Sequence, residues 1–155
     1  MNIHILAVGN RMPDWVERGY LEYAKRMPRH CRLVLREIGP GRRSKGADVN
    51  RAVKEEGARL LAAVPPGARI IALERGGNTI DTAMLARELK RWLDAGVEPA
   101  VLIGGPEGLH ADCLARATAT WSLSALTLAH PVVRVVLAEQ FYRAWSILNN
   151  LPYHR

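Results

Sequence analysis

Val101-Leu-Ile-Gly-Gly-Pro-Glu-Gly108 places a glycine-rich turn directly after a short apolar run of strand length. Gly104, Gly105 and Gly108 carry no Cβ atom, so the backbone amides and carbonyls of this turn can come close to a ligand. The pattern therefore indicates a binding loop at the end of a strand.

The residues downstream of this turn contain a second candidate loop. It reads Trp121-Ser-Leu-Ser-Ala-Leu-Thr-Leu-Ala-His-Pro131 and precedes a helix that carries Arg134, Glu139 and Arg143. The chain then ends in Pro152-Tyr-His-Arg155. Most of the candidate site thus falls in the last third of the sequence.

The rest of the chain alternates apolar runs of strand length with amphipathic runs of helix length. Asp48 and Asp81 are candidate N-caps, and Gly96 is a candidate C-cap. Strands are expected over residues 2–8, 31–38, 69–73 and 100–103, with a fifth before residue 123, and helices over 14–26, 48–63 and 81–95 and after residues 108 and 130. The chain of 155 residues is expected to form one domain, residues 1–155, in which a strand and a helix alternate five times.

Strands that alternate with helices predict an α/β fold, with a mainly parallel sheet and helices on both faces. Ligands in such sheets bind beyond the carboxyl ends of the strands. Three predicted loops lie at that edge, over residues 74–78, 104–108 and 123–130. We expect them to line one crevice.

The charge balance favours a polyanionic partner. Twenty-two Lys and Arg residues against fifteen Asp and Glu residues give a formal net charge of +7. Arg42, Arg43 and Lys45 lie in the glycine-rich segment 39–46, which is too polar to form a core. This basic loop either contacts phosphate or is a solvated connection, and both interpretations stay open.

Several other chemistries are poorly supported. The first strand leads into Gly9-Asn10-Arg11, which lacks the glycine pattern of a dinucleotide fold. Residues 41–46 have the spacing of a phosphate-binding P-loop, but Ala47 and Asp48 stand where Lys and Ser or Thr are required. The serines of the 121–131 loop are not in a nucleophile elbow, and the histidines show no metal-ligand spacing.

Cysteine usage and hydropathy bear on the compartment. Cys31 and Cys113 form no Cys-x-x-Cys pair, so both are expected to be thiols. No apolar stretch reaches the length of a membrane span, and no cleavable leader follows the first strand. A cytoplasmic protein without a membrane partner is expected.

The helix after His130 has Pro131 at a natural first position and carries an apolar stripe. Such a stripe packs either into the core or against another subunit. Glu139 and Arg143 are four residues apart and can pair on the helix surface. The stripe consists of Val133, Val136, Leu137, Phe141, Ala144 and Leu148.

Five segments give the chain a resemblance to the ribosomal RNA large subunit methyltransferase H family over essentially its whole length. They are Met12-Pro-Asp-Trp15, the basic loop ending in Ala47-Asp48, residues 102–109, residues 121–128 and Tyr153-His-Arg155. The resemblance implies a single-domain SPOUT α/β fold with a C-terminal trefoil knot. It also implies a homodimer that uses S-adenosylmethionine.

What the resemblance implies about activity is methylation of N3 of a pseudouridine in a stem-loop of large-subunit ribosomal RNA, in the assembled ribosome. It implies no metal. The cofactor-binding positions carried over from the family are Leu73, Gly104, Leu123, Ser124, Ala125, Leu126, Thr127 and Leu128. Apolar walls and backbone hydrogen bonds suit an adenine ring, although the side chains of Leu126 and Leu128 are equally compatible with core packing.

Three basic residues are candidates for catalysis. His154 has an unperturbed pKa that permits proton transfer near neutral pH. Arg155 and Arg143 can stabilise an imide anion or hold phosphate. The alternative for His154 is an ordinary frayed terminus.

One departure from the family pattern bears on the site. Many relatives carry Lys where Gly77 follows Gly76, which puts one cationic contact in doubt. Two rival functions also stay open because a fold does not settle a substrate. One is a ribosome-binding protein of this fold without turnover, and the other is a SPOUT methyltransferase acting on transfer RNA.

Overall fold

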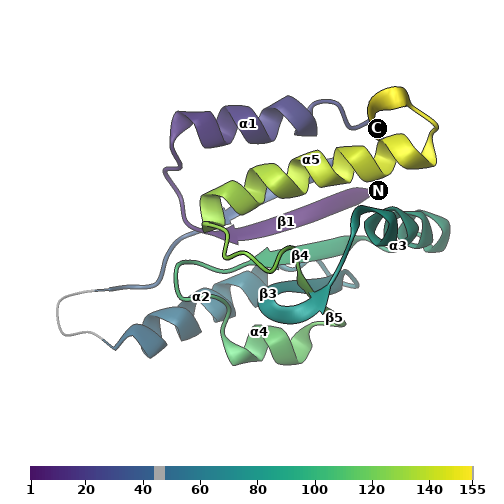
Figure 1. The fold of residues 1–155 in the computed structure, drawn as a ribbon. Helices are drawn as coiled ribbons and strands as arrows, with labels where there is room; N and C mark the ends of the chain where they lie inside the picture. The colour runs from purple at the N-terminus through teal and green to yellow at the C-terminus, as the bar shows by residue number, and fades with distance from the viewer. Residues whose placement is uncertain (44–47, 155) are drawn as a thin grey trace.

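The computed structural model describes residues 1–43 and 48–154, with His154 described by its backbone alone. Strands and helices alternate along the chain in the predicted order, and a short 3-10 helix, η1, follows the last helix (Figure 1). The strands are β1 (Asn2–Val8), β2 (Arg32–Ile38), β3 (Arg69–Thr79), β4 (Pro99–Ile103) and β5 (Ala119–Ser122). The helices are α1 (Asp14–Ala24), α2 (Val49–Ala63), α3 (Thr82–Ala95), α4 (Ala111–Arg116), α5 (His130–Leu148) and η1 (Pro152–His154).

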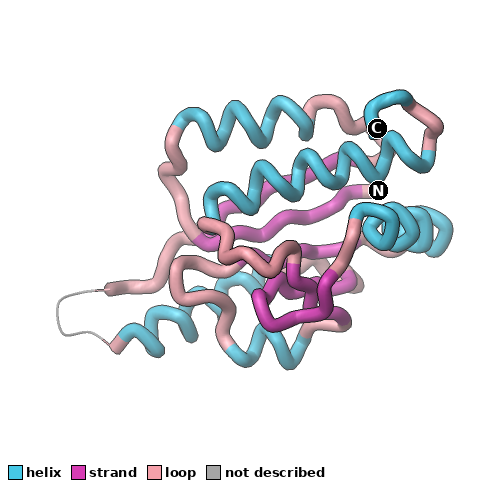
Figure 2. The backbone as a smooth tube through the Cα atoms, viewed as in Figure 1, coloured by secondary structure: helices cyan, strands magenta, loops and turns pink. Residues whose placement is uncertain are grey.

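The five strands form one sheet in the order β2-β1-β4-β3-β5, and every neighbouring pair is parallel. Figure 2 shows the strands between two sets of helices. Because the strands are parallel, the loops that follow them gather at one edge of the sheet. The predicted parallel sheet with helices on both faces is confirmed.

Two apolar cores lie on the two faces of the sheet. Alternate residues of β1 point to opposite faces, as the pleat requires. Ile3 and Ile5 pack with residues of α1, α3 and α5, whereas Leu6 and Val8 pack with residues of α2 and α4. In the stripe on α5, Leu137, Phe141 and Ala144 are buried in the first core, so this part of the stripe is core.

The predicted caps are confirmed. The carboxylate of Asp48 accepts a hydrogen bond from the amide of Asn50 at 2.9 Å, and that of Asp81 accepts one from Met84 at 2.8 Å. Gly96 ends α3 in the left-handed conformation, with φ of 65°. Each cap satisfies backbone groups that the helix leaves unpaired, and together they fix where α2 and α3 begin and where α3 ends.

The prediction that the third strand ends at Leu73 was wrong. The strand continues to Thr79, and its register with β5 shifts between Leu73 and Asn78. Gly77 allows this pairing, because a Cβ atom there would lie 2.7 Å from the carbonyl oxygen of Thr120. The two glycines that suggested a loop instead mark a close approach within the sheet.

No helix in the described ranges is long and apolar enough to cross a membrane. The trefoil knot implied by the family resemblance stays a prediction.

Candidate functional site

An open cavity of about 150 Å³ lies beyond the ends of β4 and β5, beside Leu73, Glu74 and Arg75 of β3. Residues from all three predicted segments meet there, together with the first turn of α5, so residues distant in sequence form one crevice as expected. The cavity is lined by Leu73, Glu74, Arg75, Ile103, Gly104, Gly105, Gly108, Trp121, Ser122, Leu123, Ser124, Leu126, Thr127, Leu128, His130 and Val133. Every predicted cofactor-binding residue except Ala125 is in this set; that these residues bind the cofactor stays a prediction.

The loop after β4 is tightly closed upon itself. The amide of Gly108 donates to the carbonyl oxygen of Gly105 at 3.0 Å, and Gly108 has φ of 82°. A Cβ atom on Gly104 would lie 2.5 Å from the carbonyl carbon of Gly108. Glycine is therefore required at position 104 for the loop to close, quite apart from any ligand.

The loop after β5 is held by its own serines. The hydroxyl of Ser122 donates to the carbonyl of Ser124 at 3.0 Å, and the hydroxyl of Ser124 accepts from the amide of Leu126 at 2.9 Å. The Leu126 side chain is 73% exposed, so it is not part of the core. Arg75 crosses from β3 to donate to the hydroxyl of Thr127.

A buried carboxylate, which the sequence did not reveal, ties three segments of this sheet edge together. Glu56 on α2 is only 2% exposed and accepts hydrogen bonds from the amide of Gly41 at 2.8 Å and from Nη1 of Arg43 at 2.6 Å. Arg43 also donates to Glu107, in the loop after β4, at 2.5 Å. These hydrogen bonds raise the pKa of Arg43 and lower the pKa of Glu107.

This network changes the interpretation of the basic loop. Arg43 links α2 to the loop after β4, because it pairs with Glu56 on α2 and with Glu107 in that loop. It therefore helps to hold a loop that lines the cavity. The side chain of Arg42 is exposed, and its backbone amide donates to Glu55 at 3.3 Å. Lys45, the third cation of the loop, lies outside the described residues.

A buried arginine, Arg134, attaches the first turns of α5 to the ends of β1 and β2. Arg134 is 2% exposed and donates to the carboxylate of Glu37 at 2.6 Å and to the carbonyl of Gly9 at 2.8 Å. These acceptors lie at the ends of β2 and β1, next to the cavity edge. Burial of such a charge requires these partners, and the sequence pattern alone gave no sign of them.

Tyr153, where the C-terminal tail begins, is held against α5 by a hydrogen bond and by ring contacts. The hydroxyl of Tyr153 donates to Glu139 at 2.5 Å, the guanidinium of Arg143 lies 4.8 Å from the centre of the Tyr153 ring, and Arg143 donates to Glu139 at 2.8 Å. Tyr142 packs edge-on against the same ring, with 4.7 Å between centroids. Burial alone would raise the pKa of Glu139, but the hydrogen bonds from Arg143 and Tyr153 outweigh it, and the pKa lies below its usual value.

Of the three predicted catalytic residues, Arg143 does not line the cavity. Arg143 lies thirteen residues after His130, roughly 20 Å along the helix axis. The backbone of His154 follows Tyr153 in η1, whereas the His154 side chain and Arg155 lie outside the described part of the chain. Among the described residues, no group of three His, Cys, Asp or Glu side chains could hold a metal ion.

Comparison with known proteins agrees with this architecture. A family model described as "Predicted SPOUT methyltransferase" matches residues 1–154. The chain is 52% identical to the ribosomal RNA large subunit methyltransferase H of Methylococcus capsulatus over 100% of both chains, and 50% identical to that of Marinomonas sp. over 100% of both. A probable methylase family protein from Haemophilus influenzae shares the fold, with a TM-score of 0.61 at 13% identity over 96% of this chain and 68% of that one.

The chain therefore belongs to the SPOUT methyltransferases, an enzyme class that the fold and the cavity at the carboxyl edge both fit. Within this class its full-length similarity lies with the ribosomal RNA large subunit methyltransferase H proteins. The family resemblance, the α/β fold class and the assignment as a methyltransferase are confirmed.

We predict that Glu139→Ala lowers the free energy of unfolding by about 1–2 kcal/mol, because it removes the charged acceptor shared by Arg143 and Tyr153. Urea denaturation at pH 7 measures this. The pKa of Glu139 is depressed in the folded state, so its contribution is present above the unfolded pKa. The contribution should be lost as the pH falls through the folded pKa.

Glu88→Ala is the matched control, since Glu88 pairs with Arg91 three residues on, on the surface of α3. It should cost no more than about 0.5 kcal/mol. Equal destabilisation of the two variants would show that the tail is not clamped through Glu139.

Proposed function

We propose that this protein transfers a methyl group from S-adenosylmethionine to N3 of a pseudouridine in large-subunit ribosomal RNA, within the assembled ribosome. The observation that carries the proposal is the cavity built from the loops after β4 and β5 in a chain with full-length similarity to ribosomal RNA large subunit methyltransferase H proteins. A ribosomal substrate also implies a cytoplasmic enzyme.

The residues present suit a nucleoside-based cofactor. Leu73, Leu126 and Leu128 supply apolar surface at the cavity, and the exposed side chain of Leu126 is free of the core. Gly104 and the 123–128 loop would hold the cofactor largely through backbone groups. When bound, S-adenosylmethionine supplies a methyl group already activated on a sulfonium.

The protein residues must align the acceptor with the methyl group and assist removal of the N3 proton. Correct placement of reacting groups removes several kcal/mol of the barrier. The N3 proton of the acceptor must also leave, and we assign its removal or the stabilisation of the resulting imide anion to the tail residues His154 and Arg155. Arg143 takes a positioning role, since its guanidinium stacks on Tyr153 and pairs with Glu139.

The position of Tyr153 supports a homodimer. Tyr153 is held beside Arg143, roughly 20 Å along α5 from the cavity-lining His130, while two further residues extend at most about 7 Å. This spacing supports a tail that serves the cavity of another subunit. We infer that the tail of one subunit completes the cavity of the other.

The first test is transfer of labelled methyl from S-adenosylmethionine to ribosomes from cells that lack this gene. Separated large subunits and bulk transfer RNA are assayed in parallel. We expect ribosome-dependent label at a single large-subunit pseudouridine. Label in transfer RNA would favour the rival substrate, and binding to ribosomes without label in any sample would favour a protein without turnover.

The second test asks which subunit supplies the tail. A chain truncated after Pro152 keeps its cavity but lacks the tail, whereas Gly104→Val keeps the tail but cannot close the loop after β4. Each should be inactive alone. Unfolding and refolding the two together should restore about a quarter of the wild-type activity, because half of the randomly paired dimers then hold one complete site. A mixture as inactive as its parents would contradict exchange of the tail.

The third test concerns the RNA surface. Arg42→Ala should flatten the dependence of ribosome affinity on salt by roughly 0.7 to 0.9 log-log units for each phosphate group that the protein ceases to neutralise. Arg43→Ala should chiefly lower thermal stability, because Arg43 is paired with Glu56 and Glu107. An unchanged salt slope for Arg42→Ala would make this part of the loop a solvated connection.

A further inference from the structure

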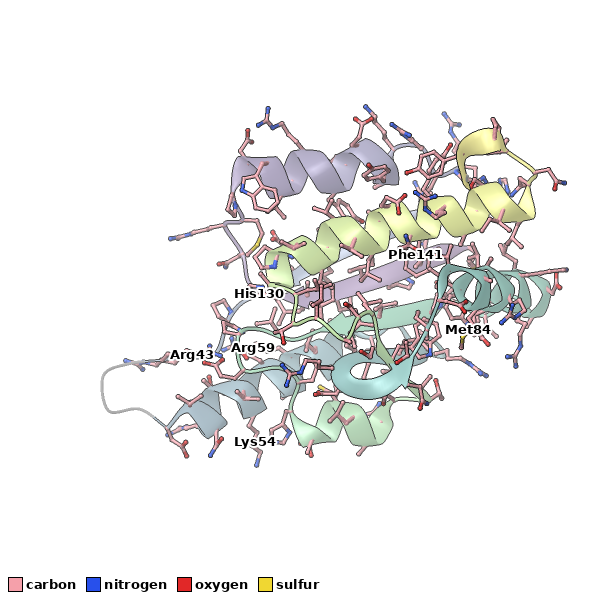
Figure 3. The ribbon with its side chains drawn as sticks, viewed as in Figure 1. Arg43, Lys54, Arg59, Met84, His130 and Phe141 are labelled. Atoms are coloured by element: carbon pink, nitrogen blue, oxygen red, sulfur yellow. The ribbon has the colours of Figure 1, made fainter. Side chains whose placement is uncertain are left out.

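A cluster of aromatic and charged side chains joins the end of α1, the middle of α5 and the C-terminal tail. The guanidinium of Arg26 lies over three tyrosine rings, with its central carbon 5.3, 5.5 and 6.0 Å from the centroids of Tyr23, Tyr142 and Tyr153. Figure 1 shows the end of α1 beside η1, which carries Tyr153. Phe141, the residue before Tyr142, is fully buried and points into the core instead (Figure 3).

The charges of this cluster are balanced. Arg26 donates to Glu22 at 2.6 Å, and Arg143, the other guanidinium at the Tyr153 ring, donates to Glu139 at 2.8 Å. Both cations can therefore lie at one ring, because each keeps its own carboxylate. A cation over a tyrosine ring is attracted by the negative face of the ring. Tyr153 is thus held by α5 through Arg143 and by the end of α1 through Arg26.

The backbone between α5 and the tail turns back at Asn150. This residue has a left-handed φ of 55°, its amide donates to the carbonyl of Ile147 at 3.3 Å, and the amide of Leu151 donates to the carbonyl of Ser146 at 2.9 Å. The two hydrogen bonds form the Schellman motif of a helix end. The turn sets the direction in which the chain leaves α5, and the Tyr153 ring sets where the chain then lies along the helix.

The position of Tyr153 bears directly on the two residues that follow it. Consecutive Cα atoms are about 3.8 Å apart, so a shift of Tyr153 displaces His154 and Arg155 as well. A displacement of about 1 Å at a reacting group can lower a rate by about 100-fold. A side chain that holds Tyr153 can therefore affect the chemistry of the tail without touching a substrate.

We propose that Arg26 is a positioning residue for methyl transfer, which holds the rings of Tyr142 and Tyr153 and so sets where the tail presents His154 and Arg155. This inference rests on the proposed function, because it takes the tail to act in catalysis. Arg26 lies outside every segment that carries the family resemblance.

Steady-state methyl transfer to ribosomes tests the proposal. Arg26→Gln removes the charge and should lower kcat about five- to thirtyfold, the effect of losing two ring contacts. KM for ribosomes and the calorimetric affinity for S-adenosylhomocysteine should stay within about twofold of wild type, because only the positioned tail is lost. Arg26→Lys keeps a cation near the rings and should keep kcat within about threefold of wild type.

Arg18→Gln is the matched control. Arg18 pairs with Asp14 across the same spacing of four residues as Arg26 with Glu22, and its side chain is 74% exposed. This variant should keep kcat within about twofold of wild type. The side chain of Arg26 is itself 37% exposed, so Arg26→Gln should stay folded, and its melting temperature checks this.

A double-mutant cycle shows whether Arg26 acts through Tyr153. Tyr153→Leu removes the ring, so adding Arg26→Gln to it should lower kcat by less than about twofold more. An equal fall in kcat with and without the Tyr153 ring would overturn the inference.

Release of Arg155 by carboxypeptidase B reports how firmly the tail is held, without any methyl transfer. The rate follows the population of the open tail, so Arg26→Gln should speed release by about the factor by which it lowers kcat, and Arg18→Gln should not. An unchanged release rate, or a change confined to KM and its salt dependence, which would mark Arg26 as a phosphate contact, would overturn the inference and leave the proposed function intact. Absence of methyl transfer by the wild-type protein would overturn both.

Discussion

The structure around the cavity depends on the buried guanidinium of Arg134. This group is almost completely removed from water, and the carbonyl of Gly9 and the carboxylate of Glu37 are the acceptors that compensate for its lost hydration. Because these acceptors sit at the ends of β1 and β2, the pairing fixes the start of α5 against the carboxyl edge of the sheet. His130 and Val133, which line the cavity, take their positions from that turn.

A second buried charge, the carboxylate of Glu56, fixes loops at the same edge from the opposite face of the sheet. Glu56 holds the loop that ends in Arg43, and Arg43 in turn reaches Glu107 after β4. Removing one partner of a buried pair leaves an uncompensated charge, so such pairs specify one arrangement of the groups around them. Both faces of the sheet thus use a buried charge to position loops at the edge where the cavity forms, while apolar packing holds the rest of the sheet.

The sequence allowed the order of elements and the helix ends to be predicted because these depend on neighbouring residues. Asp81 and Gly96 act within a few residues of their own positions. The extension of β3 to Thr79 could not be predicted in this way, since it depends on pairing with a strand some forty residues later. The carboxylate partners of Arg43 could not be predicted for the same reason, because they are set by the fold and the sequence showed only a basic loop.

The candidate site likewise contains parts that local sequence determines and parts that only the fold determines. The glycine turn and the 123–128 loop were recognisable because their geometry is encoded locally, in residues without side chains and in serines that bond their own backbone. The placement of the tail is not local: Tyr153 contacts Tyr142 and Arg143, roughly two-thirds of the way along α5. A motif at the end of the chain therefore suggested that the tail matters, and the fold adds where Tyr153, the residue before His154, is held. The proposed exchange of tails between two subunits rests on this anchor, which depends on the fold and which the terminal motif alone could not place.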